Sequence, residues 1–258
     1  MKVLVTNDDG VHAPGLHALA AGLVADGHDV FVVAPMEDMS GSAAALGPQS
    51  SVGCDIERLV LPALGASVPV VAIDGPPGLC VLLAHLGAFG ERPEIVASGI
   101  NPGSNTGRAV LFSGTVGAAL AGSRFGIPSV AVSVRKVDDE PLRLDTASSY
   151  AVAAVRWLAE HGRPVALNLN VPDLDIDAVR GVREGRLAHF GVVRTVISGQ
   201  ESRRITLVLE ETAERLDDDT DTMLVRDGYV SVNSVGGPHR VPLGDGALAA
   251  LASVGAAG

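Results

Sequence analysis

The chain has 258 residues and a formal net charge of −11 at pH 7, with 47% hydrophobic and only 3% aromatic residues. This length suits one α/β domain with an appended subdomain better than two independent domains. The acidic balance argues against a nucleic-acid polymer as partner, because phosphate backbones require clustered Lys and Arg, and Lys2 and Lys136 are the only lysines in the sequence.

The first apolar segment, residues 2–5, predicts a buried parallel strand that ends on Asn7, Asp8 and Asp9. In open α/β sheets, ligands bind at the carboxyl ends of the strands. Two adjacent carboxylates repel each other unless a cation lies beside them. Asp8 and Asp9 are therefore candidate ligands of a divalent metal, although a plain turn would use the same residue types.

A helix and a second strand follow the acidic pair. Leucines at helical spacing begin after Pro14 and stop at Gly27, which predicts a helix with one apolar face. Residues 28–35 read as a buried strand, so the three elements form a right-handed βαβ unit. The loop that follows contains Ser40 and would lie beside the acidic pair. It could offer a hydroxyl and amides to a metal or anion, or be an ordinary Ser/Gly loop.

The middle of the chain alternates between strands and helices. Residues 43–68 show no clear period and predict irregular or short-stranded structure. Residues 69–73 predict a strand, and a helix with Cys80 follows it. Residues 93–98 predict the next strand, which leads into a loop rich in small polar residues, 98–107. This loop should again end near the acidic pair.

Ser113, Gly114 and Thr115 open a run of small residues that predicts a helix. Free backbone amides and the positive dipole end make such a helix start attractive to phosphate. Either hydroxyl could instead serve as an ordinary helix cap. Residues 127–133 predict the strand that follows.

The last predicted elements divide the chain into two parts. A longer helix over 144–162 and a strand over 165–170 complete the core, and alternating stretches such as 204–209 predict hairpins beyond it. We therefore expect a catalytic core in residues 1–175. Residues 176–258 form a C-terminal extension of the same structural domain, available for pairing with a second subunit.

Cys54 and Cys80 form no C-x-x-C pair and no disulfide framework, so we expect reduced thiols. The sequence shows no basic and apolar leader, and no apolar run approaches the ~20 residues that span a membrane. These features predict a cytoplasmic protein with no membrane partner.

Several segments, in this order and spacing, resemble those of the SurE family of metal-dependent 5'- and 3'-nucleotidases. They are residues 4–10 (LVTNDDG), 13–15 (APG), 33–35 (VAP), 40–41 (SG), 98–101 (SGIN), 113–119 (SGTVGAA), 167–172 (LNLNVP) and 228–232 (GYVSV). The resemblance covers nearly the full chain. It implies a Rossmann-like three-layer sandwich with a mostly parallel sheet, and a C-terminal hairpin and helix extension used to form a homodimer or homotetramer.

The resemblance also implies a function and a set of site residues. The family hydrolyses phosphate monoesters, above all nucleoside monophosphates, with a divalent cation. The implied metal ligands are Asp8, Asp9, Ser40 and Asn101, and the implied substrate contacts are Asn101, Ser113, Gly114 and Thr115. This all-oxygen set suits one Mg²⁺ or Mn²⁺ ion per subunit better than structural zinc.

The expected mechanism is attack by a metal-activated water on the phosphate, with Asp8 and Asp9 as catalytic residues. The sequence does not decide which carboxylate accepts the proton of the water. Attack by a carboxylate to give a phospho-aspartate is the alternative. We prefer water, because a carboxylate committed to a metal is a weak nucleophile.

Residues 43–48, 76–79 and 233–237 depart from the family pattern. These departures leave open a specialised phosphatase for a biosynthetic intermediate, or a relative that binds nucleotide or phosphate without turnover. A phosphorelay receiver would need Asp74 and Lys136 as its working pair, and would leave the later Ser/Gly segments unexplained. A dinucleotide enzyme would need a glycine-rich loop where the acidic pair stands.

Overall fold

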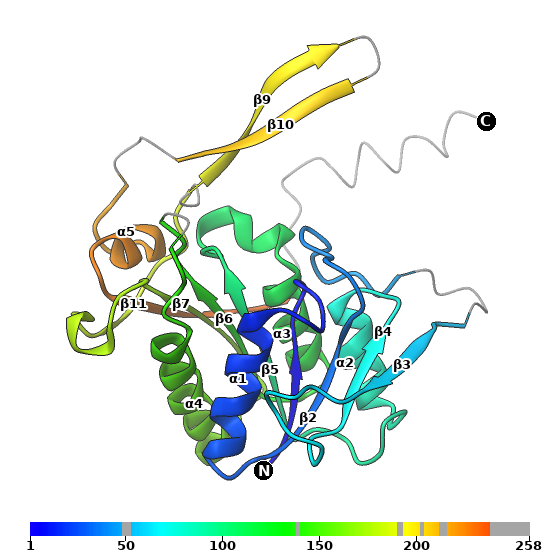
Figure 1. Cartoon of the computed structure of the whole chain (residues 1–258). Coiled ribbons are helices and arrows are strands. Elements are labelled where there is room, and N and C mark those ends of the chain that lie inside the picture. Colours follow the sequence, from blue (N-terminus) through cyan, green and yellow to red (C-terminus); the bar gives the residue numbers. More distant parts are fainter. Residues whose placement is uncertain (48–52, 138–139, 190–192, 202–203, 212–215, 238–258) are drawn as a thin grey trace, which may run out of the picture.

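The computed structural model describes residues 1–47, 53–137, 140–189, 193–201, 204–211 and 216–237. Its centre is a nine-stranded sheet, and a separate two-stranded sheet lies apart from it (Figure 1). The main sheet, in spatial order, contains β3 (Ile56–Leu59), β4 (Val70–Ile73), β2 (Asp29–Pro35), β1 (Lys2–Thr6), β5 (Ile95–Pro102), β6 (Ser129–Val134), β7 (Ala166–Val171), β11 (Val230–Val235) and β8 (Val182–Glu184).

The strands from β4 to β7 are all parallel to their neighbours. Only two strands of this sheet pair antiparallel, β3 at one edge and β11 beside β7. The mostly parallel sheet predicted from the sequence is therefore confirmed, and β3 is the short strand expected within the irregular stretch.

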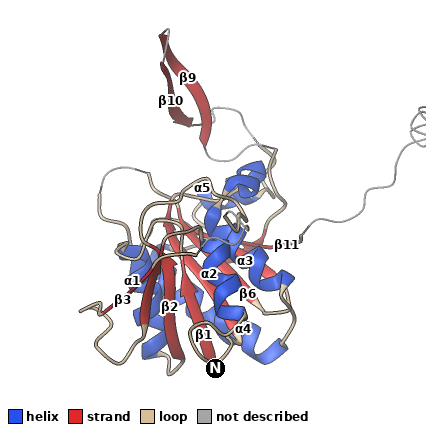
Figure 2. Cartoon of the chain, turned by 90° about the vertical axis from the view of Figure 1, so that its right-hand side faces the viewer, coloured by secondary structure: helices blue, strands red, loops and turns tan. Residues whose placement is uncertain are grey.

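Helices cover both faces of the sheet (Figures 1 and 2). One face carries α1 (Pro14–Ala25) and α4 (Leu144–His161), and the other carries α2 (Pro77–His85) and α3 (Gly114–Arg124). Alternation along β1 produces the two cores: Val3 and Val5 pack toward α1 and α4, whereas Leu4 packs toward α2 and α3. The predicted three-layer sandwich is confirmed.

Helix α1 packs very closely on β5. A Cβ atom placed on Gly15 would lie 1.9 Å from the backbone oxygen of Ile100, so no side chain fits there. We expect Gly15→Ala to lower the free energy of unfolding by about 2–3 kcal/mol, as overpacking of a core does. Urea unfolding measures this. Gly236→Ala is the control, since nothing lies within 4 Å of that position, and equal midpoints for the two variants would contradict the expectation.

β5 is longer than the sequence predicted. The apolar run ends near Ser98, yet strand pairing continues to Pro102 across a register shift between Ser98 and Asn101. The reason is β6, whose Ser133 and Val134 pair with Asn101 and Pro102, whereas β1 pairs with β5 only as far as Ser98. Asn101 therefore lies on a strand and not on a free loop.

The C-terminal part contributes to the main sheet as well as extending from it. Strands β8 and β11 join the sheet beyond residue 175, so the sheet does not end where the predicted core does. The remaining elements are the 3-10 helices η1 (Gly107–Phe112) and η2 (Ile176–Ala178), helix α5 (Asp221–Arg226), and strands β9 (Val193–Glu201) and β10 (Arg204–Glu211). The last two form the predicted hairpin, which projects from the body in both views (Figures 1 and 2). Residues 238–258 of the expected extension lie outside the described residues.

Within the described ranges, none of the helices combines the length and apolar character needed to cross a membrane.

Candidate active site

The acidic pair lies where the direction of the sheet reverses. From β1 the chain moves through α1 to β2 on one side, while β5 pairs with β1 on the other. In open α/β sheets this switch point leaves a crevice at the carboxyl ends of the two central strands. Asp8 and Asp9 follow β1, and Asn101 lies near the end of β5, so the topology brings them to one crevice.

Asp8 is buried and held by the start of α3. Its Oδ2 accepts a hydrogen bond from the Gly114 amide at 3.1 Å, and its Oδ1 accepts one from the Thr115 hydroxyl at 2.5 Å. The Met39 amide donates to the backbone oxygen of Asp8 at 2.7 Å. Burial raises the pKa of Asp8, and the hydrogen bonds from Thr115 and Gly114 act against that rise. Asp8 thus contacts both segments, residues 36–42 through its backbone oxygen and residues 113–115 through its carboxylate.

Gly114 stands against Asp8 without room for a side chain. A Cβ atom there would lie 2.7 Å from the Cβ of Asp8, from its Oδ2 and from the Ser42 hydroxyl. The Ser42 hydroxyl is buried and has no hydrogen-bond partner. A glycine is therefore required for the helix start to reach the carboxylate, and Ser42 leaves a polar group ready for a ligand at the same point.

Asp9 carries the most perturbed carboxyl of the site. Its pKa is raised from 3.8 to about 7, first by burial and then by the nearby charges of Asp8 and Asp38. Its Oδ2 is buried without a hydrogen-bond partner. An ionised carboxylate in this setting lacks compensation, which a bound cation would supply.

This pKa gives stability a pH dependence. Without a cation, folded Asp9 keeps its proton up to about pH 7, whereas the unfolded chain releases it near 3.8. The folded state thus binds more protons in this window, so its contribution to stability is lost as the pH rises from 3.8 to about 7. We expect the midpoint of thermal unfolding, measured in EDTA, to fall over this pH range. In Asp9→Asn the contribution of Asp9 to that fall should be absent. Identical profiles for the two proteins would contradict the expectation.

Ser40 and Asn101 lie near the acidic pair but make other contacts. The Ser40 amide donates to Asp38 Oδ1 at 2.8 Å, and its side chain is exposed. The Asn101 side chain donates from Nδ2 to the Gly103 oxygen at 2.6 Å, so this hydrogen bond does not use its Oδ1. Both residues stand at the predicted edge of the sheet, and their predicted role as metal ligands stays a prediction.

Ser113 serves as the N-cap of α3, because its hydroxyl oxygen accepts a hydrogen bond from the Val116 amide at 3.1 Å. The sequence allowed Ser113 to be a helix cap, and the structure shows that it is one. The hydroxyl keeps its own hydrogen, which can still be donated to a phosphate oxygen. A substrate contact by Ser113 is compatible with the cap.

The donor set fits a hard cation. Asp9 offers an uncompensated carboxylate oxygen, and the other candidates offer carboxylate, hydroxyl and amide oxygens, as Mg²⁺ and Mn²⁺ prefer. In the part of the chain that the structure describes, three or more His, Cys, Asp or Glu side chains nowhere gather as a metal-binding group. A cation bound here would therefore need Ser40, Asn101 or water besides the acidic pair.

Two sets of polar residues near the site were missed in the sequence. The Asn105 amide and backbone oxygen bind the side chains of Asn168 and Asn170, and its Nδ2 donates to the Ser133 hydroxyl at 2.8 Å. Asp221 binds the Gly107 amide from the C-terminal part. The repeated Asn of the strand 165–170 and the Thr-Asp at the start of a short helix were the available signals, but neither predicts its distant partner.

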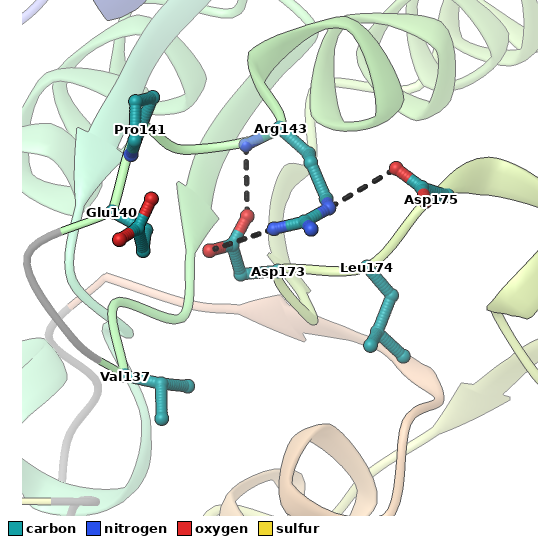
Figure 3. Close-up of a pocket in the computed structure, with 7 residues that line it drawn as sticks. All are labelled: Val137, Glu140, Pro141, Arg143, Asp173, Leu174 and Asp175. Atoms are coloured by element: carbon teal, nitrogen blue, oxygen red, sulfur yellow. Dashed lines mark hydrogen bonds and ion pairs between the residues drawn. The ribbon is translucent and has the colours of Figure 1, made fainter.

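A cavity of about 660 Å³ opens beyond the carboxyl ends of β6 and β7 (Figure 3). Arg143 lies between two carboxylates there: Asp173 accepts from its amide at 2.8 Å, and Asp175 accepts from its Nε at 3.0 Å. Since Arg143 precedes α4, this cluster fastens the start of that helix to the segment after β7. We therefore assign Arg143, Asp173 and Asp175 a structural role.

The fold and the site define a class, namely an α/β protein with carboxylates and a helix N-terminus gathered at the switch point of its sheet. Such an arrangement suits a phosphate-bearing ligand and a cation. Within that class, the chain belongs to the SurE family, because the family model described as Survival protein SurE matches residues 3–193. The family resemblance found in the sequence is thereby confirmed.

Individual relatives agree with this assignment. The chain is 38% identical over 250 residues to the 5'/3'-nucleotidase SurE of Shigella dysenteriae serotype 1, covering 94% of this chain and 91% of that protein. It is 37% identical over 239 residues to the 5'/3'-nucleotidase SurE of Cronobacter sakazakii, covering 90% and 88%. The crystal structure of the SurE protein from Aquifex aeolicus superposes with a TM-score of 0.75 at 27% identity, covering 98% of each chain.

Proposed function

We propose that this protein is a metal-dependent phosphomonoester hydrolase that releases phosphate from nucleoside 5'- and 3'-monophosphates. The nucleotidase activity is supported by the relatives, which carry the names 5'-nucleotidase SurE and 5'/3'-nucleotidase SurE at 33–41% identity. The single observation that supports the site is the acidic pair, with the buried Asp8 bound to the start of α3 and one buried oxygen of Asp9 left without a partner.

In the proposed mechanism, Asp8, Asp9, Ser40 and Asn101 hold one Mg²⁺ or Mn²⁺ ion. The bound ion would neutralise charge on a phosphate oxygen and lower the pKa of a water molecule. Ser113 and Ser42 can donate hydroxyl hydrogens to the other phosphate oxygens, and the N-terminal end of α3 favours their negative charge. Asp9 is the candidate proton acceptor, because both carboxylate oxygens of Asp8 accept hydrogen bonds from the start of α3, whereas Oδ2 of Asp9 has no partner.

Gly114 and Thr115 have a second role in this proposal. Their donors point at Asp8 and thereby fix the carboxylate. Asp8 already uses the one N–H of Gly114 and the hydroxyl hydrogen of Thr115, so the phosphate contacts proposed for these two residues stay a prediction. Asp8 is then a fixed ligand, and Asp9 is the carboxylate free to exchange a proton.

Phosphate release tests the proposal directly. The panel consists of nucleoside 5'- and 3'-monophosphates, p-nitrophenyl phosphate and polyphosphate, with Mg²⁺, with Mn²⁺ or with EDTA. We expect release from the monophosphates that EDTA abolishes and either metal restores. Metal-independent release would contradict the metal site, and no release from any substrate would favour a relative that only binds. Release from p-nitrophenyl phosphate without release from nucleotides would point to a specialised substrate.

We also propose that the protein acts as a homodimer or homotetramer in the cytoplasm, where the free thiols of Cys54 and Cys80 stay reduced. The hairpin of β9 and β10 supports the assembly. Its Ile197 and Ile205 are 62% and 57% exposed, and an isolated two-stranded hairpin is marginally stable in water. Light scattering on the purified chain gives the mass, and a monomer at micromolar concentration would contradict this part of the proposal.

A further inference from the structure

Asp221 is a fully buried carboxylate, with a relative exposure of 0%. It is the first residue of α5 and lies outside residues 3–193, the part that matches the family model. Charged carboxylates are rarely buried completely unless each oxygen has a partner. Its surroundings therefore explain why the charge is tolerated.

The two oxygens of Asp221 join three segments of backbone. Oδ2 accepts a hydrogen bond from the Gly107 amide at 2.8 Å. Oδ1 accepts one from the Ala188 amide at 3.0 Å and one from the Thr222 amide at 2.8 Å. Hydrogen bonds to an ionised group are the stronger kind. The carboxylate thus connects the C-terminal part to Gly107, which lies 114 residues away.

Gly107 begins the segment that leads to the helix start at Asp8. The 3-10 helix η1 runs from Gly107 to Phe112, and Ser113 follows it directly. The Ser113 amide donates to the Val110 oxygen at 3.4 Å, and the Phe112 oxygen accepts from the Ala43 amide at 3.2 Å. A displacement of Gly107 would therefore reach both the helix start and the loop that carries Ser40 and Ser42.

We propose that Asp221 is a positioning residue, which fixes Gly107 and thereby sets where Gly114 and Thr115 stand against Asp8. This inference rests on the proposed phosphatase function of that site. It gives the C-terminal part of the chain a share in catalysis without contact with substrate. The role is separable from general stabilisation, because it acts through one defined segment, residues 107–115.

Asp221→Asn is the informative substitution. An asparagine has the same shape but only one accepting oxygen, so its NH₂ group must face either the Gly107 amide or the pair formed by Ala188 and Thr222. The NH₂ group of the asparagine then faces a backbone N–H in a buried place, where neither has an acceptor. The backbone segment that carries this N–H therefore has to move. Asp173→Asn is the matched control: it also removes one largely buried carboxylate that accepts a backbone amide, but at the start of α4.

The experiment compares wild type, Asp221→Asn and Asp173→Asn by two measurements. The first is kcat/KM with Mn²⁺ for a nucleoside 5'-monophosphate and for p-nitrophenyl phosphate. A misplacement of the order of 1 Å costs roughly 10²-fold in rate. We expect a loss of about that size in Asp221→Asn, equal for both substrates because they share only the phosphate, and less than about threefold in Asp173→Asn. The second is amide hydrogen exchange, which should accelerate in residues 104–115 only in Asp221→Asn.

Equal activity and equal exchange in the two variants would overturn the inference. A loss for the nucleotide alone would also overturn it, since that result belongs to nucleoside recognition. If wild type releases no phosphate, the proposed function fails, and exchange in residues 104–115 alone decides whether Asp221 positions the segment. Should Asp221→Asn not fold, Asp221→Glu keeps both accepting oxygens but shifts them by one methylene, and it takes the place of Asp221→Asn in both measurements.

Discussion

Asp8→Asn is expected to lower metal-dependent phosphate release by about 10³-fold while leaving the fold intact, as loss of a key group that stabilises transition-state charge does. The asparagine can keep its oxygen toward the Gly114 amide. Its NH₂ group can face the Thr115 hydroxyl, which then accepts instead of donating. Packing is therefore preserved, and the change removes only the negative charge and one ligand oxygen. Steady-state rates with Mn²⁺ measure the loss of activity, and thermal unfolding measures whether the fold stays intact.

Asp74→Asn is the matched control for this substitution. Asp74 is an exposed carboxylate that follows β4 at the same edge of the sheet. We expect it to change the rate by less than about threefold, as surface substitutions away from a site do. It also tests the receiver hypothesis, in which Asp74 would accept the phosphoryl group. Full activity in Asp8→Asn, or inactivity in Asp74→Asn alone, would refute the proposed site.

Gly114→Ala is expected to lower activity by about 10²-fold, because the added methyl group has no space. It would lie 2.7 Å from both Asp8 and the Ser42 hydroxyl, so the helix start or the carboxylate must shift. Alanine favours the helix itself, so the loss should appear in the rate and not in helix content. Rates with Mn²⁺ and far-UV circular dichroism separate the two.

Gly236→Ala again provides the comparison, since its added methyl group meets nothing. An active Gly114→Ala enzyme would mean that the contact between the helix start and Asp8 does not matter for catalysis. A variant that unfolds would be uninformative at 37 °C, so the rate is compared at a temperature where both variants keep their circular dichroism signal.

The parallel core could be predicted from the sequence because its signals are local. Most strands of the parallel core begin with or contain a short apolar run, and helices have their own boundary residues, such as Pro14 for α1 and Gly162 for α4. The acidic pair was also predictable, since two adjacent carboxylates at a strand end suggest a cation. The family resemblance then joined distant segments into one site.

What could not be predicted depends on distant contacts. The extension of β5 to Pro102 is caused by pairing with β6, and nothing in residues 99–102 signals it. The same holds for β11, which reads as part of an extension but pairs with β7. Asp221 was missed because its partner Gly107 is set by the fold alone. For Ser113 the sequence could not distinguish a helix cap from a substrate contact, because the same residue type at a helix start serves both roles.

The span of the contacts that assemble the site has a consequence for its synthesis on the ribosome. The hydrogen bonds from Gly114 and Thr115 to Asp8 close 106 and 107 residues of chain, and the bond from Gly107 to Asp221 closes an overlapping stretch of 114. Contacts of such high sequence separation form late in folding. A nascent chain that has not yet emerged past α5 therefore holds the acidic pair without its complete surroundings. Activity should appear in one step after release of the chain, and not gradually during elongation.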